Sequence, residues 1–177
     1  MKRSCSLLAV ALAIWLTTVV ASGCDMPSVA KKTPAPTVTP MSSVEKQFFL
    51  RAKKTRDGVL RHWKAITAIT KAAGNNTAAL TSAQKDEIER HRQAVFASLH
   101  KWNGFNDYTS RMKPTVTAWF RLMRGYQDAT NSMGDLLWMP SSSHKAAFGK
   151  AMDRCSLLEK RYRRLGIAFV KTTTVAE

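Results

Sequence analysis

The residues best suited to chemistry in this chain are its histidines and cysteines, and their spacing indicates no catalytic, metal or cofactor site. The histidines form no HExxH or ExxH pattern, the arrangements that place zinc or di-iron ligands on one helix face. No Cys-x-x-Cys-His motif occurs, which argues against covalent haem, while a His/Met haem site needs no local motif and stays open. We therefore expect a non-enzymatic protein with no catalytic residue, no metal ligand and no cofactor. The histidines are His62, His91, His100 and His144.

Cys24 is the one residue whose surroundings indicate a defined chemical modification. The basic pair Lys2-Arg3 is followed by an apolar run from Leu7 to Val20, and small residues stand directly before Cys24. The apolar run is too short to cross a bilayer as a helix, which needs about 20 residues. It is typical of an export signal that is removed from the mature chain.

The residues before Cys24 resemble the lipobox of bacterial lipoproteins, although Ala21 stands where leucine is most common. The resemblance implies that residues 1–23 are removed and that Cys24 is acylated and becomes the first residue of the mature chain. Asp25 resembles the signal that keeps enterobacterial lipoproteins at the inner membrane. We therefore expect a lipid-anchored protein of the bacterial cell envelope that faces the periplasm, with the inner membrane slightly favoured.

Cysteine usage agrees with that location. Cys5 leaves with the signal and Cys24 carries the lipid, so Cys155 stands alone and no internal disulfide can form. Because Cys155 shares a helical stripe with Met152 and Leu158, we expect its thiol to be buried.

The net charge favours anionic partners. The chain has 28 basic and 12 acidic side chains, a net charge of +16, and loss of Lys2 and Arg3 with the signal leaves 26 against 12, or +14. Such a charge attracts phospholipid headgroups, lipopolysaccharide, acidic proteins or nucleic acid. No aromatic and basic nucleic-acid motif occurs, and a periplasmic location disfavours nucleic acid. We expect the membrane, anionic lipid or an envelope protein as partners, and the oligomeric state is left open.

Basic residues gather in two clusters, but neighbouring positions on a helix point in different directions, so neither cluster forms a single face. The clusters are Arg51, Lys53, Lys54 and Arg56, and Lys160, Arg161, Arg163 and Arg164.

The mature chain divides into a tether (24–43), a helical bundle domain (44–171) and a short tail (172–177). The tether holds four prolines and is typical of an extended spacer of about 3.1 Å per residue. Apolar residues at spacings of three and four predict all-α structure with four helices, at about 44–73, 82–102, 114–133 and after the serines 141–143. Whether the third helix continues through Leu137 is left open, but it must end by Pro140. Short links between them favour an up-down-up-down four-helix bundle, while an open cradle or a dimer is also compatible.

Helix-end signals agree with this division. Ser43 is the expected N-cap of the first helix and Pro114 the expected first residue of the third. Thr81 and Gln84 have the spacing of a capping box at the start of the second helix. The stripe expected to face the core in the fourth helix is Phe148, Met152, Cys155, Leu158, Tyr162, Leu165 and Phe169.

The up-down-up-down topology separates two ends. The start of the first helix, the loop 103–113 and the tail should share the end that faces the membrane, and the links 74–80 and 134–142 should share the distal end. The second of these links is unusually apolar, so we interpret it as the contact surface for a partner. Trp63, Trp102 and Trp119 fall on core stripes, unlike Trp138. The candidate partner-binding residues are Leu136, Leu137, Trp138 and Met139.

The segment Leu80-Thr81-Ser82-Ala83-Gln84 resembles the LTxxQ motif of small, basic, helical periplasmic chaperones. The resemblance implies a cradle-shaped dimer that holds unfolded chains on a basic and apolar concave surface. That family usually shows the motif twice, and it occurs once here. A third hypothesis is an exclusion or immunity lipoprotein of a plasmid or phage, which the small size and the anchor suit.

Overall fold

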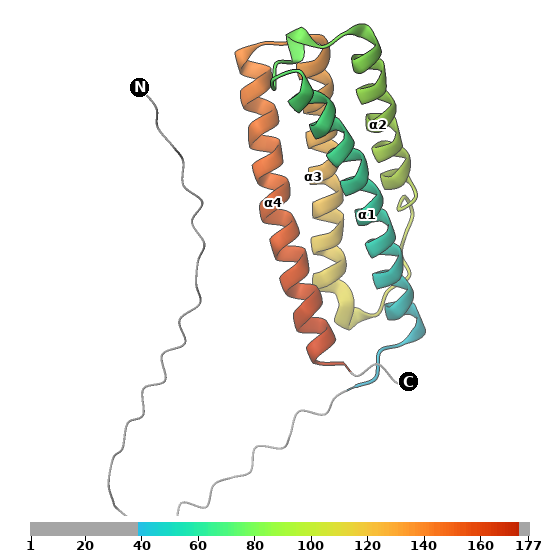
Figure 1. Cartoon of the computed structure of the whole chain (residues 1–177). Helices are drawn as coiled ribbons and strands as arrows, with labels where there is room; N and C mark the ends of the chain where they lie inside the picture. The colour runs from blue at the N-terminus through green and yellow to red at the C-terminus, as the bar shows by residue number, and fades with distance from the viewer. Residues whose placement is uncertain (1–38, 174–177) are drawn as a thin grey trace, which may run out of the picture. The chain divides into compact units, whose positions relative to one another are not determined.

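A computed structural model describes residues 39–173 of the 177-residue chain, which belong to one compact unit (Figure 1). The described residues contain the helical domain and the short stretches on either side of it. The signal 1–23, the acylation site Cys24 and the sorting residue Asp25 lie outside them.

Four α-helices and two short 3₁₀ turns make up the described part of the chain, which contains no strand. This confirms the prediction of an all-α, four-helix bundle-like fold. The helices are α1 (Ser43–Ala72), α2 (Ser82–His100), α3 (Lys113–Trp138) and α4 (Ser142–Lys171), and the 3₁₀ turns are η1 (Thr77–Ala79) and η2 (Ser110–Met112).

Helix α3 packs against both α2 and α4, and α1 packs against α2. Helices α1 and α4 also run side by side in opposite directions (Figure 1). The rings of Phe49 and Phe169 lie 5.6 Å apart, and those of Trp63 and Phe148 lie 5.8 Å apart. Large aromatic side chains therefore bridge these two helices.

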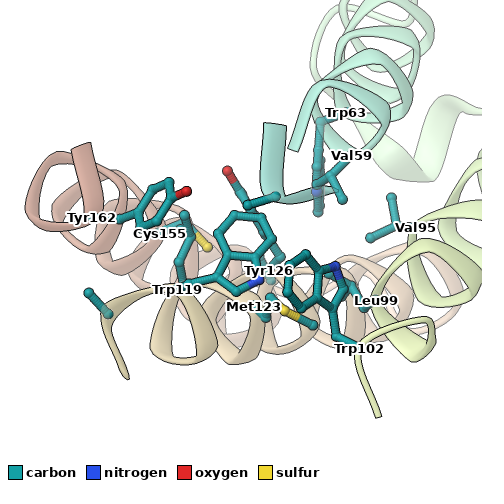
Figure 2. Packing of buried hydrophobic residues seen from close by; sticks show 14 of the residues in the cluster. Val59, Trp63, Val95, Leu99, Trp102, Trp119, Met123, Tyr126, Cys155 and Tyr162 are labelled. Carbon is teal, nitrogen blue, oxygen red and sulfur yellow. The ribbon is translucent and has the colours of Figure 1, made fainter. Parts of the chain in front are cut away.

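Several large aromatic residues pack in the core among aliphatic ones (Figure 2). Trp102 lies 5.2 Å from Trp119 and 5.6 Å from Phe48, measured between ring centroids. Both tryptophans are buried, as is Trp63, which confirms that these three are core residues. Cys155 is buried as predicted, and burial raises the pKa of its thiol to about 11.

One predicted core position is wrong. Met152 leaves 38 % of its surface exposed, although Cys155 and Tyr162 on the same stripe are buried. Met152 lies on the part of α4 that lines an open cavity beside α1, so its side chain covers the cavity wall instead of filling the core.

The helix ends differ slightly from the sequence expectation. The N-cap of α1 is Ser42, not Ser43, because Ser42 keeps an extended backbone and forms a capping box with Glu45. Pro114 occupies the second helical position, after Lys113. The capping box of Thr81 and Gln84 is confirmed.

The two ends of the bundle are grouped as predicted. At the end where α1 begins, called the proximal end here, Arg111 from the α2–α3 connection donates hydrogen bonds to Glu45 and lies over the ring of Phe169 from α4. At the opposite, distal end, the α1–α2 and α3–α4 connections line one cavity.

Candidate binding surfaces

The structure divides the four predicted partner-binding residues into two buried and two exposed ones. Leu137 has no exposed surface and Leu136 keeps 8 %, whereas Trp138 and Met139 keep 55 % and 57 %. The leucines are buried because α3 continues to Trp138. The first part of the expected link is therefore the last turn of this helix, and Leu136 and Leu137 face inward. Of the four residues, only Trp138 and Met139 are largely exposed to a partner.

Trp138 lies beside α2. The ammonium group of Lys85 stands 5.8 Å from the centroid of its ring, within the range of a cation–π contact. Leu136 faces a different surface, the wall of the distal cavity. The predicted contact surface is therefore not one patch, because its residues lie on different sides of α3.

The distal cavity is a large and mostly apolar hollow at the distal end of the bundle. It opens between α1, α3 and α4 and has a volume of about 600 Å³. No acidic side chain lines it, and Lys145 is the one cation in its wall. Its apolar wall consists of Trp63, Ile66, Met133, Leu136, Phe148 and Met152.

The cavity exists because bulky rings hold α1 and α4 apart and the α1–α2 connection turns away sharply. The rings of Trp63 and Phe148 stack with an interplanar angle of 25° and form the inner wall. Gly74 and Asn75 both have positive φ, at 67° and 59°, which reverses the chain at the cavity rim. Sequence periodicity carries no signal for this hollow, because it depends on how far two distant helices stand apart.

A second candidate surface is the basic side formed by α1 and α4, called the basic face here. Each of these helices carries eight lysines and arginines against two acidic residues. By contrast, α2 carries three of each kind, and α3 carries three basic and two acidic residues. Figure 1 shows α1 and α4 as neighbours, so the two helices that carry most of the lysines and arginines lie side by side.

Two of the four acidic residues on these helices offer little charge to solvent. Glu45 is fully buried, and Glu159 accepts hydrogen bonds from Arg56 of α1 and from Arg163. Burial raises the pKa of the Glu159 carboxyl, but the two arginines outweigh burial and lower it. Glu159 thus stays ionised and ties α1 to α4, while other cations on the face remain exposed.

Apolar side chains are interspersed with the exposed cations of α4. Leu157 and Ile167 leave 67 % and 58 % of their surface exposed. Leu157 lies three residues before Lys160, and Ile167 lies three residues after Arg164. Because the two cations are four residues apart, these side chains share the outward side of the helix. Arg163 turns instead toward Glu159, which agrees with the prediction that the cluster does not form a single face.

Two buried charged residues were missed by the sequence analysis. The Arg92 side chain is buried on the inner stripe of α2, and its Nε donates a 2.8 Å hydrogen bond to the carbonyl of Thr130 in α3. A Cβ atom on Gly134 would overlap its guanidinium group. Glu45, the other such residue, accepts hydrogen bonds from Arg111 and Thr109. Both residues bond to partners far along the chain, so local spacing could not identify their roles.

His62 and His91 also form an unexpected pair across α1 and α2. Their Nδ1 atoms lie 3.1 Å apart, which is within hydrogen-bond distance. Burial lowers the pKa of His62, and the nearby His91 and Arg61 lower it further. Within residues 39–173, no group of three or more His, Cys, Asp or Glu side chains is arranged to hold a metal ion.

No helix in residues 39–173 combines the length and the apolar character needed to cross a membrane. A scan against protein-family models found no match, and searches of curated proteins and of solved structures found none.

Proposed function

We propose that the chain is a lipid-anchored, non-catalytic protein of the bacterial envelope that binds an anionic membrane surface through its basic face. The observation that supports this most strongly is the placement of the two most basic helices side by side. Near an anionic membrane each Lys or Arg contributes about 1 kcal/mol of attraction, which decays within a Debye length. The affinity of the basic face for the membrane is thus the sum of many weak electrostatic contacts.

The exposed apolar residues favour lipid over other anionic partners. Leu157 and Ile167 lie among cations, which is the side-chain composition of a surface that rests in the headgroup region of a membrane. Leu50 on α1 is 68 % exposed and adds to the apolar surface of these two helices. After removal of the signal, a lipid on Cys24 would already hold the protein close to such a surface.

The anchor and the face are tested separately. Replacing Cys24→Ala should release the protein from the membrane fraction at physiological salt, because the basic face alone is weakened by screening. A protein that stays in the membrane fraction and still carries a lipid would contradict the assignment of Cys24.

The basic face is tested on the full chain with Cys24→Ala, which removes the lipid. It should sediment with vesicles that contain phosphatidylglycerol at low salt, but not with pure phosphatidylcholine vesicles. The double variant Lys160→Glu, Arg164→Glu should lose most of this binding. The matched control is Arg121→Glu, Arg124→Glu, which makes the same change on exposed positions of α3. Equal loss in both variants would contradict a localised face.

The exposure of Trp138 and Met139 favours a second candidate function, the binding of an envelope protein at the distal end. A photo-crosslinking amino acid at position 138, used in cells, tests it. A single captured envelope protein would support an adaptor or inhibitor. A broad range of secreted proteins would support the chaperone hypothesis instead, and no captured protein would argue against both.

A further inference from the structure

We propose that the distal cavity binds the acyl chain of a single-chain anionic lipid, such as a fatty acid or a lysophospholipid. This inference rests on the proposed function only in its choice of lipid as the ligand, because the cavity and the basic face are formed by different side chains. The cavity volume of about 600 Å³ is within the range of small-molecule sites, about 300–1,000 Å³.

The inner wall suits a flexible hydrocarbon chain. Two methionines, Met133 and Met152, face the cavity beside the stacked rings of Trp63 and Phe148. Methionine side chains adapt to irregular apolar shapes, and flat aromatic rings offer a large contact area. A ligand with many polar groups would leave them without partners against this wall, which disfavours sugars and nucleotides.

The rim suits a negatively charged headgroup. Lys145 lines the opening, and no aspartate or glutamate does. Ser141 and Ser142, also in the wall, are the N-cap and first residue of α4, where the positive end of the helix dipole lies. The hydroxyls of Thr67 and Thr70 are already bonded to backbone carbonyls of α1. The positive groups at the rim complement a carboxylate or phosphate that remains near solvent.

The cavity also opens beside the face proposed to rest on the membrane. Both are bounded by α1 and α4, so one lipid could place its headgroup near the cations while its chain enters the bundle. A single chain fits the available volume better than the two chains of a phospholipid. The occupant is therefore a single-chain lipid and not a membrane phospholipid.

The test uses the full chain with Cys24→Ala and a photoactivatable analogue of palmitate. We expect the label on cavity residues, and we expect unlabelled palmitate to compete with it more strongly than an uncharged detergent with a chain of the same length. Filling the cavity with Thr67→Trp should reduce labelling at least tenfold. The matched control Ala68→Trp adds the same ring at an exposed neighbour outside the cavity wall and should leave labelling unchanged.

The headgroup contribution is tested by charge reversal. Lys145→Glu should weaken competition by palmitate severalfold and leave competition by the uncharged detergent unchanged, whereas Lys150→Glu, outside the cavity wall, should change neither. Labels spread over the surface, or equal labelling of Thr67→Trp and the parent chain, would overturn the proposal. Failure of the basic face alone would appear as lost vesicle binding with cavity labelling retained.

Discussion

The Glu45 side chain has no exposed surface, yet it carries a full negative charge at neutral pH. Its carboxylate accepts hydrogen bonds from Arg111 at 2.6 and 2.5 Å, from the hydroxyl of Thr109 at 2.5 Å and from the backbone of Ser42 at 2.8 Å. The hydrogen bond from Arg111 lowers the pKa of Glu45 from 4.5 to about 2, against the opposing effect of burial. This residue joins α1 to the α2–α3 connection.

Replacing Glu45→Gln should lower the free energy of unfolding at pH 7 by about 2 kcal/mol, because the buried carboxylate is a stronger hydrogen-bond acceptor for Arg111 and Thr109 than a neutral amide. A carboxyl whose pKa is lowered by folding stabilises the fold above its unfolded pKa and loses that effect as the pH falls. The difference between the parent chain and the variant should therefore shrink between about pH 4.5 and about pH 2. Urea unfolding at a series of pH values measures it.

The exposed acid Glu87 of α2 provides the control. Glu87→Gln should change the free energy of unfolding by less than about 0.5 kcal/mol at pH 7. If Glu45→Gln behaves in the same way, the carboxylate is not the structural link that its contacts indicate.

Helix α2 shows how a local motif can account for a family resemblance. The residues of the LTxxQ segment form a reciprocal capping box, in which Thr81 accepts from the backbone of Gln84 and the Gln84 side chain accepts from the backbone of Thr81. This geometry explains the spacing of Thr and Gln without a chaperone function. It leaves the chaperone hypothesis dependent on binding experiments.

Replacing Thr81→Ala should lower the free energy of unfolding by about 1 kcal/mol, since one backbone N–H at the start of α2 loses its acceptor. The control is Ser82→Ala, at the exposed first position of the same helix, which makes no capping bond. Thermal unfolding of both variants measures the difference. Equal stability of the two variants would show that the capping box contributes nothing in this fold.

At the scale of the whole molecule, the excess positive charge opposes compaction. The net charge is +16, and α1 and α4 carry most of the positive charge in the described residues. Such self-repulsion destabilises a folded chain at low ionic strength. The same charge that would draw the protein to an anionic surface thus lowers its stability when it is alone.

Raising the salt concentration from about 0.01 M to about 0.15 M shortens the Debye length from about 30 Å to about 8 Å. We expect the melting temperature of the full chain with Cys24→Ala to rise over this range, because screening weakens repulsion between α1 and α4. Lys160→Glu, Arg164→Glu should show a smaller rise than the parent chain. A melting temperature that falls with salt would mean that ion pairs such as Arg154–Asp128 outweigh the repulsion.

The four helices could be predicted from the sequence alone, because apolar residues at spacings of three and four mark the side of each helix that is buried. It also predicted the burial of Cys155 and of Trp119, both of which lie on such stripes. The predictions for Cys24 and Asp25 lie outside the described residues and stay predictions. The buried side of a helix depends on the order of residues within that helix, so it can be predicted from one sequence.

Which side chains remain available for binding depends instead on how the helices pack together. Leu137 is buried in the core and Trp138 is exposed, because α3 continues to Trp138 through part of the segment expected to be a link. Packing brings Arg111 to Glu45, which lies 66 residues earlier in the sequence. Packing also places α1 beside α4, and this arrangement forms both the basic face and the distal cavity. These features depend on the distances between segments far apart in the chain, and packing of the whole bundle fixes those distances.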